Sequence, residues 1–582
     1  MIHHLHFLKV LWNHRVDHFL WIWFALTASA AILIACMVRP RSSLVRDSAK
    51  RPLGHRRSSE AVLSIAALML FLAIYTAGAL AWEDFTYYDN SHFTNETLIG
   101  RNVPLQVSPE GGRFWPLGYQ EFNVLRYVTH SISGYHMLRL IELFIVCAIL
   151  LVLDRELNVP ARVALIFLFL VAPSIVVSYS GLIYSEANLI LALTCLAWCV
   201  SRFDQSHGPA WAVGAVLSAQ IMLYYKETVF LLLVGFAGTR IVLRCRNATN
   251  RGWSFAGLRD PESRLDLCLI SLSAVFILYY LAALVPHFGA GYAEGRKLPL
   301  SQVLSTYLAL DLLVWIFALL CAVRLFLILR RRVMPSLFWD GLAVGGLCYL
   351  GGFLILRMES AYYLAPVDLI ATLYIGRLTF RSLREFTTRA KLAATVVLLF
   401  VLAQELSFSA FRIYERKNVI RAKAELGHAI NHVYVQDPQS VKRLFFPFAE
   451  PFSILEFASY LQYLGVPIQQ RLNNGEIAGG VILTGESIQA DGPCGYRSFV
   501  CHPGKTPSPG DLVIVFPDDI PVVNSSGLFR DISAKPLFSY SPSPRIPEWM
   551  LPLVGRLHFV SPIFAFRKLP TSWLRTSLSE WR

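Results

Sequence analysis

Long apolar stretches, each near the length needed to cross a bilayer, alternate with short polar segments along most of this chain. A membrane-spanning helix needs roughly 20 apolar residues, so the pattern predicts about twelve such helices. They cover residues 19–38, 61–82, 137–153, 161–178, 182–201, 210–225, 227–243, 265–286, 304–329, 340–356, 362–376 and 392–408. The stretch 210–243 is too long for one helix, and we expect two short helices that meet at Lys226-Glu227-Thr228.

Arginine-rich loops set the predicted orientation. Loops 39–60, 244–264, 330–339 and 377–391 are all basic, and the predicted spans place all four on one side. Positive loops stay in the cytoplasm. We therefore expect a multi-pass protein of a cell inner membrane, with loop 83–136, segment 287–303 and the chain from residue 409 on the periplasmic, extracytoplasmic side.

The segment 409–582 differs from the rest because it is less hydrophobic and richer in Pro, Gly and Ser. Its pattern predicts strands near residues 445–448, 479–483 and 512–516, and an amphipathic helix over 453–464. The predicted fold class is an all-α polytopic membrane bundle with a C-terminal extracytoplasmic α/β domain. Its parts are an extra span with a basic loop (1–60), a transmembrane module (61–408) and the C-terminal domain (409–582).

Composition supports the membrane class and excludes others. Of the 582 residues, 55% are hydrophobic and only 16% are charged, which is too few charges for a soluble protein of this length. The net charge of +14 lies mostly in the short loops, so it indicates topology and no nucleic-acid partner. The ten cysteines form no metal-type cluster with histidine; Cys494 and Cys501 are close enough to bridge in an oxidising compartment, or to remain free thiols.

An acidic pair, Glu83-Asp84, directly follows the predicted span 61–82 and should emerge at the start of the outer loop. A carboxylate there can act as a general base for an attacking hydroxyl. Asp84 is the candidate base, Glu83 can share that task or hold a divalent cation, and Asp89 is a third candidate. The structural alternative is that the pair caps the span or binds an arginine. The sequence leaves a requirement for a divalent cation, Mg²⁺ or Mn²⁺, open, because one carboxylate can work without it.

Further polar residues are predicted at the same face of the membrane. Loop 83–136 carries Arg113, and its run 115–128, which includes Glu121, has the mixture of aromatic and polar residues of an interfacial helix. Glu186 opens an apolar helix, where a first-turn acid favoured by the helix dipole is the structural alternative. Lys226 is a candidate phosphate ligand; an internal Lys226–Glu227 pair is its alternative.

A last constellation, from Arg357 to Pro366, also falls on the outer side. Arg357 can grip a phosphate with two hydrogen bonds. Tyr362 and Tyr363 are candidate substrate contacts or, alternatively, belt residues at the membrane surface. Acids and cations above apolar helices suit an enzyme whose leaving group is a lipid phosphate: the cations neutralise that phosphate and a carboxylate activates the acceptor.

In these motifs the chain resembles the integral-membrane GT-C glycosyltransferases, which use polyprenyl-phosphate sugars. The resemblance covers roughly residues 61–410 and rests on Glu83-Asp84, the run Trp115–Tyr127, Tyr184-Ser185-Glu186, Lys226-Glu227-Thr228 and Arg357 to Pro366. It implies a GT-C-like bundle in which Asp84 is the base and Lys226 and Arg357 bind the donor phosphate. The chain departs from the family in its span at 19–38 and in having Glu-Asp where the family has two aspartates, which leaves open which acid is the base.

The resulting hypothesis is a membrane glycosyltransferase. It would move a sugar from a polyprenyl-phosphate donor to a glycan, glycolipid or protein acceptor outside the cytoplasm. The alternatives are a polytopic transporter or flippase, and a polysaccharide ligase or polymerase that takes a glycan from a lipid diphosphate. A transporter should have polar residues at mid-membrane depth, and the sequence offers few, chiefly Glu142, Asp311 and Asp368.

Overall fold

The computed structural model describes residues 56–80, 97–108, 113–154, 156–247, 258, 260–283, 298–382, 388–447, 449, 451–472, 475–485, 492–493, 499–508 and 511–514. The predicted span 19–38 and the candidate residues Glu83, Asp84 and Asp89 lie outside these residues.

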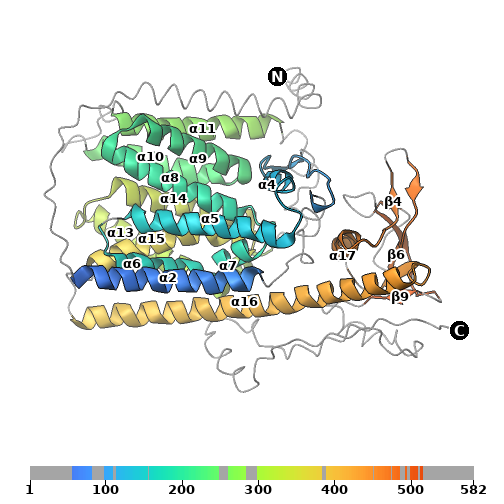
Figure 1. Cartoon of the computed structure of the whole chain (residues 1–582). Coiled ribbons are helices and arrows are strands. Elements are labelled where there is room, and N and C mark those ends of the chain that lie inside the picture. Colours follow the sequence, from blue (N-terminus) through green and yellow to red (C-terminus); the bar gives the residue numbers. More distant parts are fainter. Residues whose placement is uncertain are drawn as a thin grey trace.

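Helices packed side by side make up most of the described chain (Figure 1). They are α2 (Arg56–Leu80), α5 (Ile132–Leu153), α6 (Val159–Val171), α7 (Pro173–Ser180), α8 (Glu186–Ser206), α9 (Pro209–Tyr225), α10 (Val229–Asn247), α11 (Pro261–Ala283), α12 (Leu300–Leu310), α13 (Leu312–Leu329), α14 (Leu337–Leu356), η4 (Ala361–Leu364), α15 (Ala365–Ser382) and α16 (Thr388–Gln436). Their apolar side chains form one large core.

The chain is a multi-pass membrane protein, although the described residues do not yield the predicted count of twelve spans. Five described helices are long and apolar enough to cross a bilayer, namely α5, α8, α11, α13 and α14. The pair α6–α7 makes a sixth if its two halves, bent by 68°, count as one span. Several other predicted spans correspond to helices that are shorter, such as α12, or less apolar.

Two predicted spans are broken in the structure. The stretch 161–178 divides at Ala172 because Pro173 has no N–H to continue the hydrogen bonds of α6, and it instead occupies the first turn of α7. The stretch 304–329 divides at Asp311, whose extended backbone ends α12 while its side chain accepts a hydrogen bond from the Val314 N–H and caps α13. The prediction of single helices there was wrong.

The predicted break at Lys226-Glu227-Thr228 is confirmed. Helix α9 ends at Tyr225 and α10 begins at Val229, and Lys226 between them has an extended backbone. By contrast, α16 runs without interruption from Thr388 to Gln436, across residue 409, where the sequence predicts the start of a separate domain.

Beyond α16 the described chain forms a small sheet with a helix against it (Figure 1). The strands β3 (Arg443–Phe446), β6 (Ile482–Gly485), β7 (Gly492–Pro493), β8 (Val500–Pro503) and β9 (Leu512–Val513) lie in the order β7-β8-β6-β3-β9. Strand β3 pairs in parallel with β6 and β9, and α17 (Pro451–Tyr463) connects β3 toward β6, as parallel strands require. A separate hairpin pairs β4 (Gln470–Arg471) with β5 (Ile477–Ala478). Cys501 of β8 is disulfide-bonded, and Cys494 lies outside the described residues.

The two ends of the helical bundle differ, and each is defined by its contacts. At one end, which we call the basic end, arginine–carboxylate pairs join α10 to α8 and α11, α13 to α14, and α15 to the residue that follows α5. At the other, which we call the site end, the start of α8, the α9–α10 turn and η4 meet. Apolar residues of this end, including Phe122, Leu182 and Tyr184, belong to the same core as the sheet domain, which lies beyond it in Figure 1.

Candidate functional site

The short turn between α9 and α10 carries Lys226 into the interior of the site end. Its ammonium Nζ lies 2.7 Å from Oε1 of Glu186, the first residue of α8. Only 7% of Lys226 and 1% of Glu186 are exposed. The predicted alternative, a pair between Lys226 and Glu227, is wrong, since each of these neighbours binds a different partner.

Two tyrosine rings complete the surroundings of Lys226. Its Nζ lies 4.5 Å from the ring centre of Tyr363 and 5.8 Å from that of Tyr362, distances at which a cation is attracted by an aromatic face. The hydroxyl of Tyr362 donates to that of Tyr363 at 3.1 Å. Four predicted site residues, Glu186, Lys226, Tyr362 and Tyr363, therefore meet in one place, which we call the Lys226 cluster.

Close packing of two helices brings these segments together. Helix α10 follows Lys226 and α14 leads to η4, and the two lie against each other along their lengths. At Gly345 of α14 an added Cβ would lie 2.7 Å from the Leu232 carbonyl oxygen, so only glycine permits this approach. The packing of α10 on α14 thus fixes the separation between Lys226 and the tyrosines of η4.

Arg113 adjoins the cluster from the preceding outer loop. Its Nε donates to Oε1 of Glu227 at 3.2 Å, and the same oxygen accepts the backbone N–H of Phe114 at 2.9 Å. The guanidinium also lies 4.9 Å from the ring centre of Trp115. Burial by itself lowers the pKa of Arg113, but the charge of Glu227 more than offsets this and the net pKa is raised. Arg113 is therefore a fixed cation beside Lys226.

Glu121 belongs to a second charged group at this end. It lies in α4 (Gln120–Leu125), which is shorter than the predicted interfacial run 115–128. Val124 within α4, and Tyr127 and Val128 after it, are exposed apolar residues, as an interfacial position requires. Glu121 Oε1 accepts a hydrogen bond from Arg139 Nη2 at 2.7 Å and another from the Asn188 amide at 2.8 Å.

Arg139 is the residue of this group that the sequence analysis missed. It is 1% exposed and binds Glu142 at 2.9 Å and the Leu182 carbonyl at 2.8 Å, in addition to Glu121. The signal was present, because an arginine inside an apolar span is costly without partners. Arg139 thus links α5 to α4 and to the residues just before α8. These contacts fix the position of the first turn of α8, where Glu186 lies.

Arg357 lies at the end of α14, just before the segment that leads to η4. It ends α14 in the left-handed conformation (φ 55°), its side chain is exposed, and it forms no ion pair with the described residues. Such a backbone is unfavourable for any residue other than glycine. Tyr119, which precedes α4, shares this conformation at φ 64°, but His207 after α8 and Arg331 after α13 do too, at the basic end, so this backbone conformation does not by itself mark the site.

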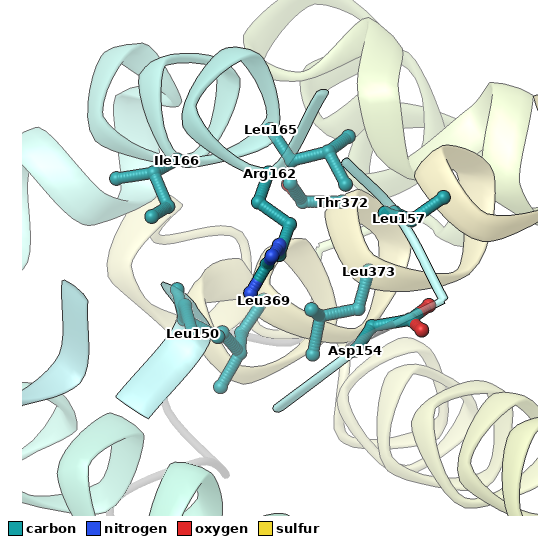
Figure 2. Close-up of a pocket in the computed structure, with 9 residues that line it drawn as sticks. All are labelled: Leu150, Asp154, Leu157, Arg162, Leu165, Ile166, Leu369, Thr372 and Leu373. Atoms are coloured by element: carbon teal, nitrogen blue, oxygen red, sulfur yellow. The ribbon is translucent and has the colours of Figure 1, made fainter. Parts of the chain in front are cut away.

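The described bundle also contains a small pocket, but it lies at the basic end. Figure 2 shows its lining: Leu150, Asp154, Leu157, Arg162, Leu165, Ile166, Leu369, Thr372 and Leu373. Asp154 is already held by Arg377 at 3.0 Å, and Arg162 donates to the Leu151 carbonyl. This pocket is small, mostly apolar and distant from the Lys226 cluster, so it is not the candidate site.

Solved structures of loosely similar backbone course include two of one protein. No protein-family model matches the sequence, and no curated protein matches it. ArnT from Cupriavidus metallidurans bound to undecaprenyl phosphate aligns at 10% identity and a TM-score of 0.39, over 70% of this chain and 75% of that one. ArnT from the same organism in the apo state aligns at 12% identity and a TM-score of 0.44, over 82% and 96%. At such TM-scores the likeness is loose, and the chemistry of the site has to be argued from the residues of this chain.

Proposed function

We propose that this protein is a membrane glycosyltransferase that moves a sugar from a polyprenyl-phosphate donor to a glycan, glycolipid or protein acceptor outside the cytoplasm. The observation that carries the proposal is the Lys226 cluster. It is a buried ammonium at one end of an apolar bundle, held by a single carboxylate and two tyrosine rings. An ammonium has three N–H donors, and the described residues use one of them in a hydrogen bond. The others are available to phosphate oxygens.

The reaction requires charge neutralisation at the leaving group. The bond between the sugar carbon and the phosphate oxygen breaks, and its electrons remain on the departing polyprenyl phosphate. Lys226, with Arg113 beside it, stabilises that negative charge in a site where little water screens it. The acceptor oxygen attacks the same carbon from the opposite face, so the sugar carbon is inverted.

The acceptor must lose a proton as it attacks, and Asp84 or Glu83 is proposed to take it. Both residues lie outside the described residues, but helix α2 ends at Leu80, and Figure 1 draws this end of α2 toward the sheet domain. Glu83 and Asp84 follow this end of α2 by three and four positions in the sequence, which supports the assignment.

The remaining expectations belong to the same proposal. We place the Lys226 cluster and the C-terminal domain on the periplasmic side of an inner membrane, as the basic loops predict. The described residues include no group of three His, Cys, Asp or Glu side chains that could hold a metal ion. Glu83 and Asp89 stay the candidates for binding Mg²⁺ or Mn²⁺, and a chelator in the transfer assay decides whether either ion is needed.

The proposal is tested in membranes that receive a radiolabelled polyprenyl-phosphate sugar. The wild-type protein should release polyprenyl phosphate and transfer the label to an acceptor. Asp84→Asn should lower the rate by about 10²–10⁴-fold, the usual contribution of a general base, and Glu83→Gln shows whether the first acid shares the role. Arg332→Met, an exposed residue of the basic end, is the matched control. Wild-type activity in Asp84→Asn together with Glu83→Gln would remove the acidic pair from the mechanism.

Transport is the second candidate, and one observation favours it: the broken helices α6–α7 and α12–α13 meet buried carboxyl groups, as in transporters with discontinuous helices. Flux of a lipid-linked sugar across proteoliposomes without a covalent product would establish it. A ligase or polymerase would release a lipid diphosphate and give a long product on a gel.

A further inference from the structure

Three buried carboxyl groups gather within the bundle, apart from the Lys226 cluster. Asp311 lies between α12 and α13, Asp368 in the first turn of α15, and Glu405 in α16; each is at most 1% exposed. Among the described residues no lysine, arginine or histidine forms an ion pair with any of them. Buried carboxylates without a cation are costly, so this group needs another explanation.

Two of the three carboxyl groups are only half satisfied by protein donors. Asp311 accepts the Val314 N–H at 3.1 Å through Oδ1, and Asp368 accepts the Ser174 hydroxyl through Oδ2. The second oxygen of each, Oδ2 of Asp311 and Oδ1 of Asp368, is buried and has no hydrogen-bond donor. The two side chains are within hydrogen-bonding reach of each other. Two ionised carboxylates cannot hydrogen-bond, whereas a carboxylic acid donates to a carboxylate.

Glu405 is satisfied in a different way. Its Oε1 accepts the backbone N–H groups of Leu312 at 3.0 Å and Leu313 at 3.2 Å, at the start of α13. The positive end of that helix can stabilise roughly half an elementary charge. Glu405 still repels Asp311 and Asp368 electrostatically, and this repulsion is a further reason for the pair to carry a proton.

We propose that Asp311 and Asp368 form a proton-binding site, in which one proton is shared between Asp311 Oδ2 and Asp368 Oδ1. The proton gives both orphaned oxygens a partner and removes one negative charge from the interior. A metal ion is the poorer occupant, since the described residues contain no group of three side chains suited to hold one. The proposal does not depend on the proposed transferase function.

Two segments of the chain connect the Asp311–Asp368 pair to the Lys226 cluster. Asp368 follows Tyr363 by five positions along η4 and α15, and Ser174 belongs to α7, which packs against η4 and leads to Glu186. The Ser409 hydroxyl binds the Val171 carbonyl at 2.7 Å, which fixes α16 to the same break between α6 and α7. The shared proton therefore holds together the segments that carry Tyr363 and Glu186.

Infrared spectroscopy of the full-length protein in detergent tests the proposal directly. At neutral pH the wild-type spectrum should contain the carbonyl stretch of a protonated carboxylic acid, shifted in heavy water. Asp368→Asn and Asp311→Asn should each remove the absorbance of one acid per chain. Either asparagine can donate to the remaining aspartate, so both variants should fold. Asp154→Asn, a buried acid paired with Arg377, is the matched control and should leave the band unchanged.

Thermal unfolding as a function of pH gives a second readout. An unfolded aspartate has lost its proton at neutral pH, whereas the folded pair retains one, so the folded protein binds more protons and its stability falls as pH rises. The wild-type melting temperature should drop from neutral to alkaline pH more steeply than that of Asp368→Asn. Absence of the infrared band in the wild type would overturn the proposal. So would a rise in melting temperature on adding Na⁺ or Ca²⁺ at fixed pH that Asp368→Asn abolishes.

Discussion

The two ends of the helical bundle both contain buried cations, but they satisfy them differently. At the basic end Arg240, fully buried, donates Nε to Asp266 at 2.8 Å and both terminal nitrogens to Asp204 at 2.8 and 2.7 Å. At the site end Lys226 has one hydrogen bond, to Glu186, and two aromatic rings. Arg240 thus has little capacity left to bind anything else, whereas Lys226 keeps N–H donors for a ligand. Saturated pairing indicates a structural role, and incomplete pairing is what a binding site needs.

The largest expected effect comes from breaking the saturated pair. Arg240→Met leaves Asp204 and the fully buried Asp266 with Arg244 as their remaining cation, which binds Asp266 and lies 3.9 Å from Asp204. Loss of one partner of a buried ion pair costs about 3–5 kcal/mol, and Arg244 offsets part of that loss, so the free energy of unfolding in detergent should fall by about 3 kcal/mol, the lower end of this range. Arg332→Met serves as the exposed control. Any protein that remains folded should keep its transfer rate, and a folded but inactive Arg240→Met variant would refute the assignment of a purely structural role.

The second-largest effect is expected at Lys226, whose N–H donors are only partly used by Glu186. Lys226→Met should lower kcat/KM for transfer by about 10²–10³-fold, the usual loss when one charge-stabilising donor is removed from an active site. The substitution also leaves the buried carboxylate of Glu186 without its cation. The double variant Lys226→Met/Glu186→Gln removes both charges and should regain most of the stability lost in the single variant. Transfer at the wild-type rate by the double variant would show that Lys226 is not a phosphate ligand.

The smallest effect is expected at the rim of the site end. Arg357→Gly removes an exposed charge from a position whose left-handed backbone glycine adopts readily. The melting temperature should therefore stay equal or rise slightly. Because exposed charges contribute about 1 kcal/mol or less, KM for the lipid-linked donor should rise by no more than about fivefold with kcat unchanged. A large fall in kcat would place Arg357 among the groups that touch the reacting phosphate.

Local patterns sufficed wherever the physical cause was local. The charged residues at 226–227 interrupt an apolar stretch and gave the break between α9 and α10 correctly. Strand-like runs near 445–448 and 479–483 lie at β3 and β6, and the predicted helix over 453–464 lies at α17. The break at Pro173 was also visible in the sequence, but the apolar run around it was long enough to suggest one span.

By itself, the sequence determined that the chain crosses a membrane several times and where many of its helices and strands lie, because hydrophobic length and the orienting effect of basic loops act locally. Which charges meet was decided only by the tertiary structure. Lys226 binds Glu186, forty positions away, instead of its neighbour Glu227, and Asp311 lies beside Asp368, 57 positions away. Such partners are chosen by how close the helices can approach, as at Gly345 between α10 and α14, and helix packing cannot be deduced from spacing along one chain.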